Sequence, residues 1–335
     1  MITAAPQSRQ PESWQQALAS AITDPAELCR VLGLDPAFAA AAGAATAQGF
    51  RLRVPRGFVR RMAHGDPADP LLRQVLPLAA ELHSPPGFSG DPLHEAAARS
   101  APGLLQKYRG RALLITTGAC GVHCRYCFRR EYPYAEDSAE GARWQAAITA
   151  IAADPEIEEV ILSGGDPLSL SDARLGQLSQ QIAAIPHVQR LRLHTRQPVV
   201  LPERVDAGLV GWLAGLRWRP VIVLHANHGN EIDASVIAAC RRLQSAGATL
   251  LNQSVLLAGV NDNVRALRDL SLALWSAGVL PYYLHLLDQV RGASHFAVGL
   301  EQARQLHTQL MGEVPGYLLP RLVREVPGAA SKLPA

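Results

Sequence analysis

The stretch GACGVHCRYCFRREYPY, residues 118–134, contains three of the five cysteines in a chain of 335 residues. Cys120, Cys124 and Cys127 lie within eight positions of one another. Directly before them, residues 111–117 (RALLITT) form an apolar run rich in β-branched side chains, which predicts a buried strand. The cysteines therefore follow the end of a strand, where parallel α/β folds place their functional residues.

Five more short apolar runs follow the cysteine segment and predict further strands. They begin near residues 159, 190, 220, 249 and 281. Helical patterns such as ARLGQLSQQIAAI and ASVIAACRRLQSAG lie between them. Strands that alternate with helices pair in parallel through right-handed crossovers. The sequence therefore predicts an α/β fold of six units, as a partial barrel or an open doubly wound sheet, and not a closed barrel of eight.

Polar residues gather at the carboxyl ends of these runs. The polar segments are residues 163–166, 194–196, 225–228, 252–254 and 285–288. Because the carboxyl ends of parallel strands meet at one edge of a sheet, these segments are expected to lie close to the cysteines. The repetition over successive strands predicts a functional site at that edge.

Before residue 100 the apolar residues recur at helical spacing, and this part of the chain is predicted to be mainly helical. Asp24 before Pro25 is a typical N-cap with proline at the first helical position. A link rich in proline and glycine follows at residues 84–93. We expect three regions: a helical N-terminal region at 1–100, a barrel at 101–300 and a C-terminal segment at 301–335.

Composition excludes several classes of protein. The formal net charge is +3 and the arginines are spread along the chain, which does not favour a nucleic-acid binder. The alanine-rich stretch 37–47 falls short of the roughly 20 residues of a membrane span, and the first residues lack a signal-peptide pattern. A cytoplasmic protein is expected, in which clustered cysteines serve metals or catalysis. The isolated Cys29 and Cys240 are expected to be buried as small hydrophobic side chains.

The spacing of the cluster, Cys-x3-Cys-x2-Cys, leaves three interpretations open. A structural zinc site needs a fourth ligand, which His123 inside the loop could supply. Three unrelated buried thiols are the second interpretation. The third is a [4Fe–4S] cluster in which three thiolates bind three irons and the fourth iron stays open for a small molecule. Three cysteines in one loop at a strand end favour the cluster.

The cysteine motif, with Tyr126 before its last member, resembles the radical S-adenosylmethionine superfamily. That resemblance implies a partial (β/α)6 barrel and an open iron that chelates S-adenosylmethionine, whose cleavage yields a 5′-deoxyadenosyl radical. The SGGDP segment after the second strand resembles the superfamily's glycine-rich segment, which holds the methionine amino group. Ser163, Gly164, Gly165 and Asp166 are therefore expected to bind the cofactor, with glycines that allow a close backbone approach.

Over almost its whole length the chain resembles the lysine 2,3-aminomutase family. The segments CRYCFRREYPYAE, EEVILSGGDPL, LNQSVLLAGVNDN, PYYLHLLD and SKLP carry this resemblance. It is closest to the short, EpmB-type branch, which implies an isomerase that converts (S)-α-lysine to (R)-β-lysine for modification of translation elongation factor P. Three alternatives remain: release of free β-lysine, action on another amino acid, and a non-catalytic iron–sulfur or zinc protein.

The chemistry of the family also requires pyridoxal phosphate and a lysine that holds it as a Schiff base. Lys107 and Lys332 are the only lysines in the chain. Lys332, in GAASKLPA, matches the pyridoxal lysine of the family. Tyr108 and Arg111, beside the start of the first strand, match positions that hold the phosphate group.

Substrate recognition is expected to use opposite charges at the two ends of lysine. Arg129 matches the family's arginine for the carboxylate, which a planar guanidinium suits. Asp288 and Glu325 are expected to bind the ε-ammonium group, although Glu325 stands where longer family members have aspartate. His225 and Gln253 match positions near the adenosine and pyridoxal groups. A core histidine and a strand-end hydrogen bond are the structural alternatives for these two.

The resemblance also implies partners. They are the substrate L-lysine, an electron donor of the flavodoxin or ferredoxin type, and a functional link to a lysyl-ligase of elongation factor P, with no nucleic acid and no membrane. The chain ends at Ala335, where longer members continue into a zinc-binding segment that joins subunits. The sequence therefore gives no basis for predicting the family's tetramer here.

Overall fold

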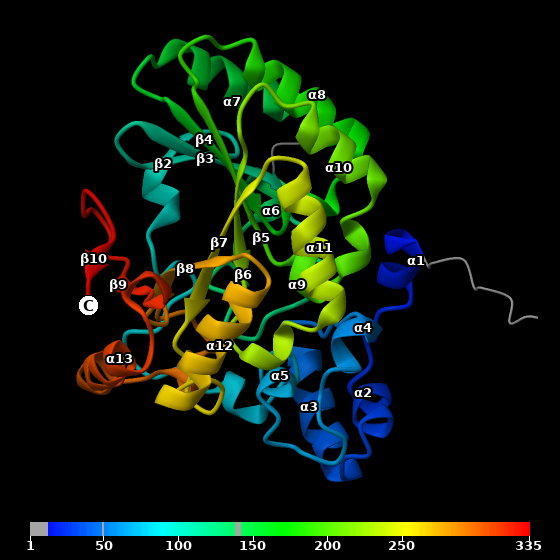
Figure 1. Ribbon diagram of the computed structural model, residues 1–335. Helices are drawn as coiled ribbons and strands as arrows, with labels where there is room; N and C mark the ends of the chain where they lie inside the picture. Colours follow the sequence, from blue (N-terminus) through cyan, green and yellow to red (C-terminus); the bar gives the residue numbers. More distant parts are fainter. Residues whose placement is uncertain (1–12, 49, 138–141) are drawn as a thin grey trace, which may run out of the picture.

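The computed structural model describes residues 13–48, 50–137 and 142–335. The segment 1–12, on which the expectation of no signal peptide depends, lies outside these ranges. One curved sheet of ten strands, in the order β1 to β10, forms the centre of the molecule. Most of the long helices lie along its outer side, as Figure 1 shows for α7, α8, α10 and α11.

Six parallel strands make up the middle of this sheet. They are β3 (Arg111–Thr117), β4 (Glu159–Gly164), β5 (Arg190–Thr195), β6 (Val221–His225), β7 (Thr249–Val255) and β8 (Leu280–His285). Each pairs in parallel with the next one along the chain. Across the part of the chain that the structure describes, the first and last strands of the sheet do not pair. The predicted α/β fold with an open, partial (β/α)6 barrel is confirmed.

The connecting helices follow the pattern expected of such units. They are α6 (Tyr134–Asp137), α7 (Ala142–Ala153), α8 (Asp172–Ala183), α9 (Gln197–Val200), α10 (Ala207–Ala214), α11 (Ala234–Ser245) and α12 (Val264–Ser276). Side chains alternate between the two faces of each strand. On β3, Ala112 and Leu114 join the apolar core shared with the helices, whereas Arg111 and Leu113 line a cavity on the inner face. This alternation makes the inner face available for polar residues.

Four strands at the two edges of the sheet were not predicted. They are β1 (Arg99–Ala101), β2 (Leu104–Tyr108), β9 (Arg321–Arg324) and β10 (Leu333–Pro334). Their sequences are short and partly charged, so they lack the apolar runs that mark the central strands. Leu333 of β10 pairs with Arg324 of β9. This pairing fixes Lys332, the residue directly before β10, against the edge of the sheet.

The N-terminal region is mainly helical. Its helices are α1 (Trp14–Ala19), α2 (Pro25–Val31), α3 (Pro36–Gln48), α4 (Arg56–Val59) and α5 (Pro70–Arg73). As predicted, Asp24 caps α2, and its carboxylate accepts the backbone N–H groups of Ala26 and Glu27. The apolar side chains of this region pack against Val122 in the cysteine loop and Val200 in α9. The helical extension therefore covers the carboxyl edge of the strands.

Two further expectations concern burial and membranes. Cys29 and Cys240 are 2% and 0% exposed, as predicted for small hydrophobic side chains.

The last α-helix, α13 (Leu300–Glu313), lies beside α12 and leads to β9. Within the described ranges, no helix is both long enough and apolar enough to cross a bilayer. The proposed boundaries of the three regions remain a prediction.

Candidate active site

The inner face of the sheet encloses a cavity of about 470 Å³. Every residue predicted to bind a cofactor, substrate or metal contributes to its wall. These residues are Tyr108, Arg111, Cys120, Cys124, Cys127, Arg129, Ser163, Gly164, Gly165, Asp166, His225, Gln253, Asp288, Glu325 and Lys332. They come from seven strands or strand ends and from the tail of the chain. The fold therefore brings together residues that are more than 200 positions apart.

The three cysteines of the loop after β3 lie close enough to influence one another's ionisation. Burial raises the pKa of Cys120 well above its usual value, and the neighbouring Cys127 and Asp166 raise it further. Burial and then Cys124 raise the pKa of Cys127 to about 11. Thiols whose pKa is raised as it is for Cys120 and Cys127 become thiolates near neutral pH only beside strong positive charge, which the irons of a cluster would supply.

The zinc interpretation finds no support in this geometry. His123 donates from Nδ1 to the backbone oxygen of Arg51 at 2.9 Å, and its ring stacks on Phe50. Its position is thus explained by contacts with the N-terminal region. Among the residues described, no group of three or more His, Cys, Asp and Glu side chains is arranged to hold a single metal ion. A cluster has a different requirement, because each thiolate binds a different iron.

The glycines after β4 serve the close packing of two loops. Gly164 has a φ of +118°, and a Cβ there would lie 2.6 Å from the backbone oxygen of Thr117. A Cβ on Gly165 would lie 2.5 Å from the backbone oxygen of Ala119. Glycine is therefore required for contact with the cysteine loop itself. The predicted contact of these glycines with a cofactor is a separate matter and remains a prediction.

Asp166 joins the ends of β4 and β5. Its Oδ1 accepts the hydroxyl of Thr195 at 2.7 Å and the backbone N–H of Leu168 at 3.0 Å. Its Oδ2 accepts the backbone N–H groups of Arg196 and Gln197. Burial raises its pKa to about 6 despite these hydrogen bonds. The side chain thus shapes the cavity wall beside Cys120.

Arg129 is held by a carboxylate that sequence reasoning missed. Its Nε and Nη2 donate to the two oxygens of Glu95 at 2.7 and 2.8 Å, and Lys107 lies 3.0 Å from the same carboxylate. Although burial opposes ionisation, Arg129 and Lys107 lower the pKa of Glu95 to about 2. The remaining nitrogen, Nη1, lies 3.2 Å from the hydroxyl of Ser163. No sequence pattern links Glu95, at the start of a short 3-10 helix, to Arg129 in the cysteine loop, because the two residues are 34 positions apart.

The opposite charges near the tail form a second group. Lys332 Nζ contacts Glu325 Oε1, and Lys107 Nζ lies 3.6 Å from Glu325 Oε2. Burial works against ionisation of Glu325, but Lys332 and Lys107 lower its pKa overall. Asp288 behaves differently: burial and the neighbouring Glu325 raise its pKa to about 7. The two predicted ammonium-binding acids therefore differ in charge near neutral pH.

Three histidines face the cavity in their neutral form. The Nε2 atom of His225 lies 2.9 Å from the hydroxyl of Tyr126, and burial, aided by Arg196, lowers the pKa of His225 to about 3. Burial also holds the pKa values of His194 and His285 well below normal, and the charge of Lys332 adds to this. The Nε2 atoms of His194 and His285 are buried without a hydrogen-bond partner among the described residues.

Comparison with known proteins decides the family. A family model described as a 4Fe-4S single cluster domain matches residues 108–191. The L-lysine 2,3-aminomutase of Escherichia coli (strain K12) is 50% identical, and the match covers 96% of this chain and 94% of that protein. The chain belongs to the L-lysine 2,3-aminomutase family. The Haemophilus influenzae protein of that name is 46% identical over 98% of this chain and 96% of its own length.

More distant members of the L-lysine 2,3-aminomutase family match less of their own length. The Clostridium subterminale protein is 37% identical over 85% of this chain and 68% of its own length. Among solved structures, a radical SAM methyltransferase from Sphaerobacter thermophilus has a TM-score of 0.47 and 15% identity over 66% of this chain and 68% of that chain. This partial likeness decides nothing about the present chain.

Lysine 2,3-aminomutases depend on a [4Fe–4S] cluster, S-adenosylmethionine and pyridoxal phosphate, and the cavity fits such groups. The raised pKa values of Cys120 and Cys127 mean that these thiols need a cationic partner in order to ionise. The unpaired Nε2 atoms of His194 and His285 near Lys332 need polar partners, which a substituted aromatic cofactor offers. The Arg111 guanidinium lies 5.2 Å from the ring of Tyr108, and both residues line the cavity. Burial and Glu325 raise the pKa of Tyr108 to about 12, so its hydroxyl remains a hydrogen-bond donor.

Several cavity residues had not been predicted from sequence to bind a ligand. They are Glu95, Lys107, Arg192, His194, Tyr283, His285 and Arg321. Six of these lie on strands, and the pairs on β5 and β8 occupy alternating positions of one face; they are Lys107 on β2, Arg192 and His194 on β5, Tyr283 and His285 on β8, and Arg321 on β9. The two-residue period of the strands could have identified them once the inner face was known.

Proposed function

We propose that the protein is an L-lysine 2,3-aminomutase, an isomerase that converts (S)-α-lysine to (R)-β-lysine. Near full-length similarity to enzymes of that name supports this. The observation that carries it is the cavity shared by the three loop cysteines and Lys332, with cationic and anionic groups between them. A binding protein has no need for that combination.

The substrate's two charged ends match the charges of the cavity. Arg129, whose Nε and Nη2 are held by Glu95, directs Nη1 to the Ser163 hydroxyl and the backbone oxygen of Gly164 in the cavity wall, where it is proposed to exchange these partners for the substrate carboxylate. Glu325 and Asp288 supply negative charge for the ε-ammonium group. Because both acids lie on the tail side of the cavity with Lys332, the substrate is proposed to span from β3 to β8 and β9.

The reaction moves an amino group from Cα to Cβ after cleavage of an unactivated C–H bond. Side-chain acids and bases cannot break such a bond, so the bound cluster, S-adenosylmethionine and pyridoxal phosphate supply the radical and amino-carrying chemistry. The chain's own residues hold these groups and the substrate in position and exchange protons with them. Cys120, Cys124 and Cys127 are proposed to bind the cluster, and Lys332 to hold pyridoxal phosphate.

Asp288 is proposed to accept and donate a proton in the part of the cavity that contains Lys332. The two side chains lie near enough for the charge of Lys332 to lower the pKa of Asp288, against the larger effect of burial. With a pKa of about 7, the Asp288 side chain is close to half ionised at neutral pH, which suits it to accept a proton from a bound molecule and to return it later. Glu325 stays ionised and holds Nζ in place.

We also propose the cellular context that the family resemblance implies. The electron donor is a flavodoxin or ferredoxin, and the product serves a lysyl-ligase that modifies elongation factor P in the cytoplasm. Similarity to the E. coli protein over nearly its whole length supports this branch. Release of free β-lysine and action on another amino acid are the alternatives.

A substrate panel tests the proposed function. The reconstituted protein is incubated anaerobically with S-adenosylmethionine, a reductant and one of lysine, norleucine or glutamate. Lysine is expected to yield its β-isomer, whereas norleucine lacks the ammonium group and glutamate carries the opposite charge. Equal turnover of glutamate would overturn the role assigned to Asp288 and Glu325.

A further inference from the structure

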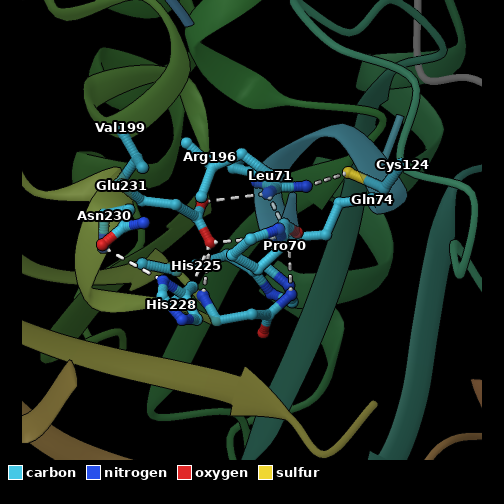
Figure 2. Close-up of polar contacts among 12 residues, drawn as sticks. Pro70, Leu71, Gln74, Cys124, Arg196, Val199, His225, His228, Asn230 and Glu231 are labelled. Carbon is cyan, nitrogen blue, oxygen red and sulfur yellow. Dashed lines mark hydrogen bonds and ion pairs between the residues drawn. The ribbon is translucent and has the colours of Figure 1, made fainter. Parts of the chain in front are cut away.

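A buried arginine touches one of the three loop cysteines. Arg196, directly after β5, donates from Nη1 to the Sγ atom of Cys124 at 2.8 Å, as Figure 2 shows. Its side chain is 6% exposed. Cys127 is reached instead by the backbone N–H of Arg129. Cys124 therefore faces a full positive charge at hydrogen-bond distance.

The guanidinium of Arg196 is fixed by its other contacts. Its Nη2 donates to Gln74 Oε1 at 2.7 Å and to Glu231 Oε2 at 2.9 Å. The rings of Phe58 and Tyr126 each lie 5.6 Å from its central carbon. These contacts come from the N-terminal helices, the cysteine loop and the segment after β6. The arginine thus cannot leave Cys124 without breaking a buried network.

Glu231 gives this network a firm anchor. Its side chain is fully buried, and its Oε1 accepts the backbone N–H groups of Asn227 and His228 at 2.8 and 3.1 Å. Gln74 Nε2 donates to the same oxygen at 3.1 Å. Figure 2 shows the Glu231 carboxylate between Arg196 and His228, which follows β6. A carboxylate held in this way fixes the position of the cation that it pairs with.

One nitrogen of Arg196 has no acceptor. Its Nε is buried and has no hydrogen-bond partner among the described residues, although the side chain lines the cavity. All other polar atoms of the guanidinium are paired. An inorganic sulfide or a further thiolate lone pair at this wall is the type of acceptor that would satisfy Nε.

We propose that Arg196 is a positioning residue that sets the reduction potential of the iron–sulfur cluster through its contact with Cys124. This inference rests on the cluster assignment in the proposed function. Reduction adds one electron and so increases the negative charge on the cluster and its thiolates. A fixed hydrogen-bond donor with positive charge stabilises the reduced form more than the oxidised form, and so raises the potential. The electron comes from the low-potential donor already proposed.

The test compares midpoint potentials of anaerobically reconstituted variants. Wild type, Arg196→Lys and Arg196→Met are titrated with dithionite in the presence of redox mediators and followed by electron paramagnetic resonance. Arg204→Lys and Arg204→Met are matched controls, because Arg204 is also fully buried and paired, with Asp172, but contacts no cysteine. Iron content and circular dichroism are measured for every variant.

The methionine variant at position 196 is expected to show a more negative midpoint potential than wild type. The midpoint potential of Arg196→Lys is expected to lie between those of wild type and Arg196→Met, because lysine keeps the positive charge but lacks the planar guanidinium. The controls should keep the wild-type potential. If Arg196→Met fails to bind iron, the comparison of midpoint potentials between Arg196→Lys and wild type tests the inference.

Unshifted potentials in iron-loaded variants of Arg196 overturn this inference and leave the proposed function intact. Loss of iron from both Arg196 variants, with iron retained by the Arg204 variants, also overturns it, because Arg196 then only maintains the loop. A wild-type protein that binds no cluster would remove the proposed function as well.

Discussion

Asp288 is expected to make the capture of lysine depend on pH. Burial and Glu325 raise its pKa to about 7, whereas the pKa of Glu325 is lowered. The substrate's amino groups titrate well above neutral pH, so Asp288 controls the acid limb. For a group of pKa about 7, the ionised fraction predicts that kcat/KM rises about fivefold from pH 6 to pH 7 and about twofold from pH 7 to pH 8.

The substitution Asp288→Asn should remove this acid limb. It should also lower kcat/KM at pH 8 by roughly 10- to 100-fold, because a hydrogen bond to a charged group is worth about 1.5–3 kcal/mol. The assay measures β-lysine formation at lysine concentrations below KM between pH 6 and pH 8. A wild-type profile that is flat over this range, or an asparagine variant that keeps the limb, would refute the reasoning.

The same substitution, Asp288→Asn, should stabilise the fold at high pH although it lowers activity. The pKa of Asp288 is higher in the folded chain than in the unfolded chain, so the folded state disfavours the ionised form. This penalty is absent below about pH 4, grows as the pH rises towards 7 and is complete above it, with an upper size of about 4 kcal/mol. At pH 8 the cofactor-free Asp288→Asn variant should therefore unfold at higher urea concentration than wild type, and near pH 4 the two should coincide.

Three other substitutions test separate parts of the site. Lys332→Ala should abolish β-lysine formation and the absorbance of bound pyridoxal phosphate but leave the iron content unchanged; a parallel loss of iron would count against the assignment. Cys124→Ala should stop cleavage of S-adenosylmethionine, measured as 5′-deoxyadenosine, and normal cleavage would exclude a ligand role. Gly165→Ala places a Cβ 2.5 Å from a backbone oxygen, so urea unfolding should show a loss of at least about 1–3 kcal/mol, and an unchanged free energy of unfolding would contradict that geometry.

The central strands could be predicted because their signals are local. Runs such as RALLITT and VILSGG are apolar and β-branched, and helical patterns separate them. The edge strands β9 and β10 form for a different reason. β9 pairs in parallel with β8, and the two-residue β10 pairs with β9. No local pattern encodes a strand that exists because its neighbour offers an edge.

The candidate site shows the same division between local and long-range information. The cysteine spacing pointed to Cys120, Cys124 and Cys127, and the scarcity of lysine together with the family resemblance pointed to Lys332; all four residues line the cavity. Glu95 had no such signal, since its importance arises only where it meets Arg129 in space. The glycines after β4 were identified, but their close contact is with the cysteine loop. Residue type and spacing in the sequence indicated the cofactor chemistry, whereas the contacts between these residues depend on the packing of the folded chain.

The most direct test of the account is the identity of the product. The protein is loaded anaerobically with iron, sulfide and pyridoxal phosphate, and receives S-adenosylmethionine, a reductant and (S)-α-lysine. Chromatography and mass spectrometry then separate α- from β-lysine. The account predicts (R)-β-lysine, formed only when all three cofactors are present. A fully loaded protein that forms neither β-lysine nor 5′-deoxyadenosine would contradict it.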